Sequence, residues 1–146
     1  MNPEITVILP FYNAADTLET AIKSILNQSF ENFEFLLIDN NSTDTSFSIA
    51  RIFAKKDSRI KLLKETKQGV ANAMNLGLKN ALGKYVARMD ADDISMPLRF
   101  EKQLQYLNEN PTVEFVGCKV RYVPHNENTA GFKRFVDWAN SFNTST

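Results

Sequence analysis

The chain is poor in the residues that build disulfides and zinc sites. Its 146 residues contain one cysteine, Cys118, and one histidine, His125. A single cysteine cannot form an intrachain disulfide, and one cysteine with one histidine cannot supply the four ligands of a structural zinc ion. Cys118 lies in the strand-like run 113–118, where a buried, inert thiol is expected. His125 lies in a polar loop and is expected at the surface.

The chain also lacks an excess of one charge and any long apolar run. Lys and Arg number 17, as do Asp and Glu, so the formal net charge is zero, whereas a general nucleic-acid binder would carry a basic excess. No apolar stretch approaches the roughly 20 residues of a transmembrane helix, and residues 1–4 lack the basic region of a signal peptide. We therefore expect a cytoplasmic protein that binds no nucleic acid and has no transmembrane segment, with peripheral attachment to the inner face of the membrane left open.

Strand-like and helix-like stretches alternate along most of the chain. Apolar runs at 5–9, 33–38, 60–63 and 85–89 alternate with helical stripes near 16–28, 43–54, 70–81 and 97–107. This alternation predicts an α/β fold, a Rossmann-like and mostly parallel sheet with helices on both faces. A further strand-like run covers 113–123, and an aromatic stripe predicts a helix over 132–142. The predicted helix N-caps are Asp16, Ser42 or Thr43, and Ser95, the last followed by Pro97 at the first helical position.

Three carboxylates, Asp90, Asp92 and Asp93, directly follow the run 85–89, which is expected to be a buried strand. Like charges this close raise one another's pKa, so a positive group is expected beside them, and a divalent cation is the simplest candidate. Polar groups also follow the first two strands, at 11–13 and 39–42. Because ligands bind outside the carboxyl ends of parallel strands, we expect these segments to share one site. A solvated acidic turn is the alternative.

The chemistry that suits this edge is transfer from a nucleotide-activated donor. The carboxylates would repel a nucleotide diphosphate unless Mg²⁺ or Mn²⁺ bridged them to phosphate oxygens, and the same ion would neutralise a departing diphosphate. The chain has no G-x-x-x-x-G-K-[ST] loop and no G-x-G-x-x-G after the first strand. A P-loop NTPase and a dinucleotide-binding Rossmann domain are therefore disfavoured.

Four motifs resemble those of family 2 glycosyltransferases with the GT-A fold. Residues 7–13 (VILPFYN) resemble the opening strand and nucleotide loop, and residues 24–30 (SILNQSF) resemble the S-x-L-x-Q segment. Residues 38–44 (IDNNSTD) resemble the base-binding VDDGSTD loop, and residues 89–99 (MDADDISMPLR) resemble the D-x-D-D…P-x-R/K metal segment. Together the motifs cover almost all of residues 4–110 in order. The chain is thus similar to the N-terminal, donor-binding part of such an enzyme.

The resemblance implies roles for single residues. Tyr12 and Asp39 would border the base, Asp90 would lie near the ribose, Asp92 would bind the metal, and Asp93 would support the metal site without touching the ion. The alternatives are a packing aromatic for Tyr12 and an Asx turn for Asp39. The further donor-site residues that the resemblance implies are Pro10, Asn40, Lys67 and Ala91.

Two positions depart from the family pattern. Asn40 stands where many members have a second acid, and an amide can donate a hydrogen bond as well as accept one. The donor nucleotide is therefore open between UDP, which is favoured, dTDP and GDP. Residues 67–75 (KQGVANAMN) match the pattern N-x-G-x-x-x-A-R-N, but Met74 replaces the usual arginine. Lys67 is the candidate substitute for that cation.

The resemblance implies an inverting, metal-dependent glycosyltransferase that uses Mn²⁺ or Mg²⁺. It would transfer a sugar from a nucleotide-diphosphate donor to a hydroxyl of a glycan or lipid-linked acceptor, in cell-surface or extracellular polysaccharide synthesis. Two alternatives remain: a nucleotide-binding module without transferase activity, and a nucleotidyltransferase. The nucleotidyltransferase is disfavoured because its Gly-rich phosphate loop is absent after the first strand.

The catalytic base has no candidate in a matching motif. Inverting members use a carboxylate well beyond the metal segment to deprotonate the acceptor hydroxyl. After residue 123 the acidic residues are Glu127 and Asp137, and neither lies in such a motif. We therefore expect residues 1–123 to form the donor-binding subdomain and residues 124–146 to start a truncated acceptor-side region. On this interpretation the base lies outside the chain, and the chain alone is inactive.

Overall fold

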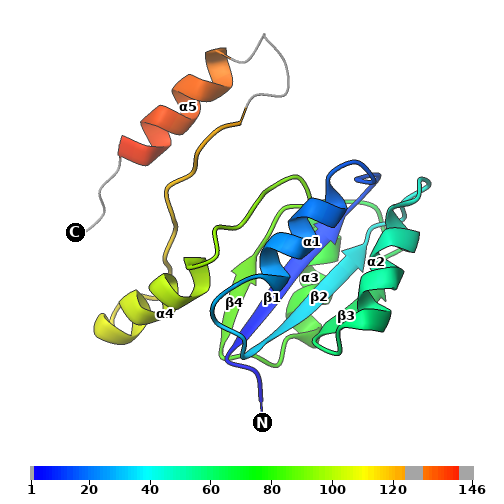
Figure 1. Cartoon of the computed structure of the whole chain (residues 1–146), viewed down its shortest axis with the longest axis horizontal. Helices are drawn as coiled ribbons and strands as arrows, with labels where there is room; N and C mark the ends of the chain where they lie inside the picture. The colour runs from blue at the N-terminus through cyan, green and yellow to red at the C-terminus, as the bar shows by residue number, and fades with distance from the viewer. Residues whose placement is uncertain (1, 124–129, 142–146) are drawn as a thin grey trace. The chain divides into compact units, whose positions relative to one another are not determined.

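The computed structural model describes residues 2–123 and 130–141, so His125, Glu127 and Phe142 lie outside the described residues. The chain divides into two compact units, 1–101 and 102–146, which are described separately. The first contains β1 (Ile5–Phe11), α1 (Leu18–Leu26), β2 (Phe33–Asp39), α2 (Ser46–Lys56), β3 (Ile60–Lys64), α3 (Val70–Asn80) and β4 (Tyr85–Arg88). Helix α4 (Arg99–Glu109) begins in the first unit and continues in the second, which also holds α5 (Ala130–Ser141) (Figure 1).

The four strands form one parallel sheet in the order β3-β2-β1-β4, which confirms the predicted α/β fold. In register, Ile5 of β1 lies opposite Phe33 of β2 and Tyr85 of β4. A helix connects each strand to the next in the sequence. All four carboxyl ends therefore reach the same edge of the sheet, where the polar segments were expected.

Helices cover both faces of the sheet, so every residue of β1 and β2 is buried. Helices α1 and α2 pack together on one face, and α3 packs against β1 and β2 on the other (Figure 1). Gly77 permits the close approach of α3: a Cβ at this position would lie 2.5 Å from Cγ2 of Ile8 and 2.8 Å from Cδ1 of Ile38. A larger residue would push the helix off the sheet.

Strand β4 differs from the prediction of a buried strand. It is the last strand in the sheet order and pairs with β1 alone among the described strands. Its residues alternate between half-buried and exposed, with Val86 and Arg88 exposed. The strand therefore places Arg88 where it can meet solvent or a ligand.

A buried polar network closes the amino end of the sheet. Oε1 of Glu34 accepts hydrogen bonds from the Thr6 hydroxyl and the Leu82 N–H, both at 2.6 Å. Oε2 of Glu34 pairs with Nζ of Lys61 at 2.8 Å. The Gly83 N–H donates to the Thr6 hydroxyl at 2.8 Å. The network satisfies the buried Glu34 carboxylate and ties β1, β2 and β3 to the turn before β4.

The predicted N-caps of all three helices, α1, α2 and α4, were wrong. Helix α1 begins after Thr17 instead of Asp16, and α2 begins after Thr45 instead of residue 42 or 43. Neither Thr17 nor Thr45 makes a side-chain cap hydrogen bond. At α2 the reason is that the Ser42 hydroxyl is engaged elsewhere, because it accepts the backbone N–H of residue 13 at 3.2 Å.

The start of α4 is held by Gln28, which lies just after α1. The Gln28 side-chain NH₂ donates to the Met96 carbonyl at 2.8 Å and to the Ser95 hydroxyl at 3.1 Å. Its Oε1 accepts the Phe100 N–H at 3.2 Å. Helix α4 therefore begins two residues after the predicted first position, and this buried glutamine, not Ser95, satisfies a first-turn N–H.

In the second unit the run 113–123 is not a strand, and Cys118 is exposed, so both expectations were wrong. No described strand pairs with this run. Instead, the Asn140 side chain of α5 makes two hydrogen bonds to the backbone of Val120. Nδ2 of Asn140 donates to the Val120 carbonyl at 2.6 Å, and Oδ1 of Asn140 accepts the Val120 N–H at 2.9 Å. The predicted terminal helix is confirmed as α5, and its aromatic residues Phe132, Phe135 and Trp138 are exposed.

Candidate functional site

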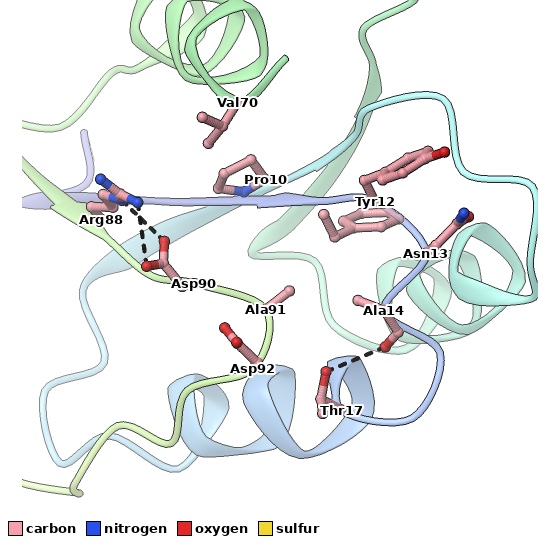
Figure 2. A pocket seen from close by; sticks show the side chains of 11 residues that line it. Pro10, Tyr12, Asn13, Ala14, Thr17, Val70, Arg88, Asp90, Ala91 and Asp92 are labelled. Atoms are coloured by element: carbon pink, nitrogen blue, oxygen red, sulfur yellow. Dashed lines mark hydrogen bonds and ion pairs between the residues drawn. The ribbon is translucent and has the colours of Figure 1, made fainter. Parts of the chain in front are cut away.

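A pocket of about 400 Å³ lies at the carboxyl ends of β1 and β4 (Figure 2). It brings together segments that are some eighty residues apart in the sequence, as the edge of a parallel sheet is expected to do. Five predicted site residues line it: Pro10, Tyr12, Asp90, Ala91 and Asp92. Phe11 and Asn13 line it too, as expected for the segment 11–13, and the lining residues that the sequence did not single out are Ala14, Thr17, Val70 and Arg88.

The four other predicted residues, Asp39, Asn40, Lys67 and Asp93, do not line this pocket. Asp39 and Asn40 are buried, and Lys67 and Asp93 are exposed. The Lys67 carbonyl accepts a hydrogen bond from Nδ2 of Asn40. These residues lie at or just after the carboxyl ends of β2, β3 and β4.

The loops after β1 and β2 are joined by hydrogen bonds in both directions. Asn13 has a left-handed backbone with a φ of 46°, which asparagine tolerates better than most residues. Its Oδ1 accepts the N–H groups of Thr43 at 2.8 Å and Asp44 at 3.3 Å. The Ala14 N–H donates in return to the Ser46 hydroxyl at 2.8 Å. These contacts fix the loop that carries the pocket wall at residues 12–14.

Tyr12 stands beside this joined pair of loops and is 50% exposed. Tyr12 is one of the residues that line the pocket (Figure 2). A packing aromatic would be buried, so the structure disfavours that alternative. The ring offers a flat apolar surface and a phenolic hydroxyl to a ligand.

Asp39 is fully buried at the end of β2. Its Oδ1 accepts the Ser42 N–H at 3.0 Å, so the Asx-type turn is present. Its Oδ2 is buried and has no hydrogen-bond partner within the described part of the chain. One oxygen therefore holds the turn, and the other is a buried acceptor without a donor among the described residues, which is uncommon in folded proteins.

The acidic segment carries a positive partner within the protein. Nε of Arg88 lies 3.0 Å from Oδ1 of Asp90, and Nη2 of Arg88 lies 3.3 Å from Oδ2 of Asp90 (Figure 2). Although the Asp93 side chain is exposed as a whole, partial desolvation of its carboxyl raises its pKa, and the charges of Asp90 and Asp92 raise it further. The predicted mutual repulsion is therefore present at Asp93, and Arg88 supplies part of the positive charge expected beside the cluster.

Arg88 was missed because its strand was interpreted as buried. Among the described lining residues of the pocket it is the one cation. Met74, at the position of the family's usual arginine, packs instead against the core formed by Ile8, Leu36, Ile38 and Ala73. The Arg99 guanidinium donates to the Arg88 carbonyl at 2.9 Å and so ties the start of α4 to the end of β4.

A divalent cation fits this edge only together with a ligand. Among residues 2–123 and 130–141, no three His, Cys, Asp or Glu side chains gather to hold a metal ion. Mg²⁺ in proteins is usually bound by one or two carboxylates together with substrate phosphates and water. Asp92, with Asp90 beside it, matches that donor set, and the pocket has room for the remaining ligands.

The family model described as glycosyl transferase family 2 matches residues 6–145. The chain belongs to this family. An uncharacterized glycosyltransferase of Rickettsia conorii is 46% identical over 107 residues, which are 73% of this chain and 18% of the relative. The chain spans less than half the length of the curated relatives it matches.

Solved structures of glycosyltransferases share the fold. The mannosyltransferase PcManGT from Pyrobaculum calidifontis, in complex with GDP-Man and Mn²⁺, matches with a TM-score of 0.74 and 33% identity over 83% of this chain and 36% of its own. S. aureus TarS 1-349, in complex with UDP, matches with a TM-score of 0.69 and 25% identity over 84% of this chain and 38% of its own. In the described part of this family 2 chain, no helix is long and apolar enough to cross a membrane.

Proposed function

We propose that this chain forms the donor-binding part of an inverting, metal-dependent glycosyltransferase. The observation that carries the proposal is the pocket in which Tyr12, Asp90 and Asp92 lie together at the carboxyl ends of β1 and β4. The solved relatives that hold UDP or GDP-Man support a nucleotide-diphosphate sugar as the ligand. On this proposal residues 1–123 form the donor subdomain, and residues 124–146 lead into the acceptor side.

The base of the donor would lie between Tyr12 and Asp39. The ring of Tyr12 would border the base, and the unpaired Oδ2 of Asp39 would accept a ring N–H. Uracil, thymine and guanine each present such an N–H. The donor is therefore UDP, which we favour, or dTDP or GDP.

The diphosphate would lie over the acidic segment. Asp92 would hold Mn²⁺ or Mg²⁺ together with phosphate oxygens, and Asp90 would face the ribose. Asp93 would support the metal site without touching the ion. When bound, the ion supplies positive charge to the departing diphosphate. Pro10 and Ala91 would form walls of the donor pocket. Lys67 does not line the pocket, and we propose that it contacts the donor at the rim of the pocket.

The transfer itself would be a direct displacement. The acceptor hydroxyl oxygen attacks the anomeric carbon, the bond from that carbon to the diphosphate oxygen breaks, and the configuration inverts. A carboxylate takes the hydroxyl proton. We assign this base to the acceptor side and not to the carboxylates of the donor pocket, whose proposed partners are the ion and the ribose. The acceptor would be a hydroxyl of a glycan or lipid-linked acceptor in cell-surface or extracellular polysaccharide synthesis, as the family resemblance implies, and we propose that the chain acts in the cytoplasm.

Calorimetric titration of UDP, dTDP and GDP, each with Mn²⁺ and then with a chelator, tests the donor site. We expect at least one nucleotide to bind, with an affinity that falls when the metal is removed. Asp92→Asn should reduce metal-dependent binding by roughly 10- to 100-fold, because a charged ligand of the ion is lost. Asp137→Asn, the same change on exposed α5, is the matched control and should leave binding unchanged. If none of the three nucleotides binds with or without metal, the proposal is wrong.

A further inference from the structure

Asn40 follows Asp39 at the end of β2, and the two side chains serve different partners. Successive residues of an extended chain point to opposite sides. Asp39 reaches the N–H of its own loop, at Ser42, whereas the Asn40 side chain reaches a loop about twenty-five residues further along the chain, at residues 65–69. Asn40 is 4% exposed and does not line the pocket.

Both ends of the Asn40 amide are occupied. Nδ2 donates to the Glu65 carbonyl at 3.1 Å and to the Lys67 carbonyl at 2.9 Å. Oδ1 accepts the Gly69 N–H at 2.7 Å. Two carbonyls on one side and an N–H on the other determine which end of the amide is nitrogen. Both of the amide's N–H donors are thus used within the protein.

The loop that Asn40 holds leads directly to the pocket wall. The Glu65 N–H donates to the Asp39 carbonyl at 2.8 Å, which extends the β2–β3 pairing into the loop. Gly69 then has a φ of 124°, in the region that favours glycine, and α3 begins at the next residue. That residue, Val70, lines the pocket. A shift of this loop would therefore move Val70.

We propose that Asn40 is a positioning residue that fixes residues 65–69 and the start of α3, and that it does not read the base of the donor. Base selection then falls to Asp39 and the pocket wall, and the amide at position 40 leaves the choice between UDP, dTDP and GDP unaffected. This replaces the direct base contact expected for Asn40 from the family resemblance. The inference rests on the proposed nucleotide-sugar site.

The amide is required by the chemistry of its partners. An ionised aspartate accepts hydrogen bonds and cannot donate them. An aspartate at position 40 could still accept the hydrogen bond from the Gly69 N–H. Its other oxygen, however, would place negative charge against the carbonyls of Glu65 and Lys67. Two hydrogen bonds would be lost, and two buried carbonyl oxygens would be left facing a carboxylate. The loop is expected to move away, and the pocket wall with it.

The test compares Asn40→Asp with Asn32→Asp, the same change at an exposed residue just before β2, at the opposite end of the strand. Titration of UDP, dTDP and GDP with Mn²⁺ measures the three affinities, and hydrogen exchange measures the protection of the Gly69 N–H. For Asn40→Asp we expect all three affinities to fall by the same factor, roughly tenfold, with faster exchange at Gly69. Asn32→Asp should change neither quantity.

A second variant, Asn40→Ala, covers the case in which Asn40→Asp does not fold. It removes the side chain from both loop and ligand, and it should also lower the three affinities by one common factor. A change of more than fivefold in the ratio of UDP to GDP affinity, with Gly69 exchange unaltered, would overturn the inference in either variant. If the unmodified chain binds none of the nucleotides, the proposed function fails, and Gly69 exchange still decides whether Asn40 holds the loop.

Discussion

At the scale of single residues, the pocket is defined as much by Arg88 as by the carboxylates. Arg88 and Asp90 are about half exposed, 60% and 43% by side chain, and such pairs contribute about 0–1 kcal/mol to stability. The pair therefore does little for folding. Its main effect is on the charge of the pocket: it offsets Asp90, and on the proposed function it leaves Asp92 as the carboxylate that would hold the ion.

Removing the Arg88 guanidinium should strengthen the binding of a cation and weaken the binding of an anion. For Arg88→Gln we expect Mn²⁺ alone to bind more tightly, because Asp90 loses its partner. UDP in the presence of a chelator should bind more weakly, because the anion loses a nearby cation. Each change should be up to about fivefold. Calorimetry measures both, and Arg51→Gln, an exposed arginine of α2, is the control. Unchanged affinities for both ligands would contradict this role for Arg88.

The residues that sequence reasoning assigned well are those whose position follows from the strand ends. Tyr12 and Asp92 line the pocket because each lies three residues beyond a predicted apolar run, 5–9 or 85–89, and parallel strands end at one edge. Arg88 was missed because the edge position of β4 depends on strand order, which periodicity does not reveal. The partners of Asn40 lie 25–29 residues away and depend on how the β3–α3 loop packs, so a family motif alone does not predict them.

At the scale of secondary structure, the alternation of strands and helices was predictable and their ends were not. Helical and strand periodicities differ enough to locate β1 to β3 and α1 to α3 within a few residues. The run 113–123 has the residue pattern of a strand, but no described strand pairs with it. The ends depend on groups distant in sequence, as Ser42 and Gln28 show, because hydrogen bonds between loops compete with local caps.

Gln28 provides a test at this scale, because it links the end of α1 to the start of α4. Gln28→Ala would leave the Phe100 N–H and the Met96 carbonyl without their partner, and we expect the free energy of unfolding to fall by about 2–3 kcal/mol. Urea denaturation measures it. Gln105→Ala, at an exposed position of α4, should cost less than about 0.5 kcal/mol. Equal losses in the two variants would show that Gln28 does not hold α4.

At the scale of the whole molecule, the two ends of the sheet serve different purposes. The carboxyl end leaves polar groups available, such as Oδ2 of Asp39 and the carboxylate of Asp92. The amino end, in contrast, satisfies its buried carboxylate within the protein, through the partners of Glu34. Stability that depends on pH should therefore arise in part at the amino end, away from the pocket, where a substitution can test it without touching the donor site.

Glu34 should make the molecule less stable in acid. Burial acts to raise its pKa, but hydrogen bonds from Lys61, Thr6 and Leu82 outweigh burial and hold the pKa below its ordinary value of 4.5. A lowered pKa in the folded state contributes stability above the unfolded pKa, and that contribution is lost as the pH falls through the folded value. The free energy of unfolding should therefore decline as the pH falls below about 5.

Glu34→Gln tests this assignment, because it removes the charge while keeping the shape of the side chain. At pH 7 we expect it to lower the free energy of unfolding by roughly 2 kcal/mol, since the charge-assisted bonds to Lys61 and Thr6 weaken. Its curve of stability against pH, measured by urea denaturation from pH 7 to pH 3, should be flatter than that of the unmodified chain. Glu114→Gln, at an exposed position, should reproduce the unmodified curve. Parallel curves for Glu34→Gln and the unmodified chain would place the acid sensitivity at another carboxylate, such as Asp57, whose pKa its hydrogen bond to Arg59 lowers.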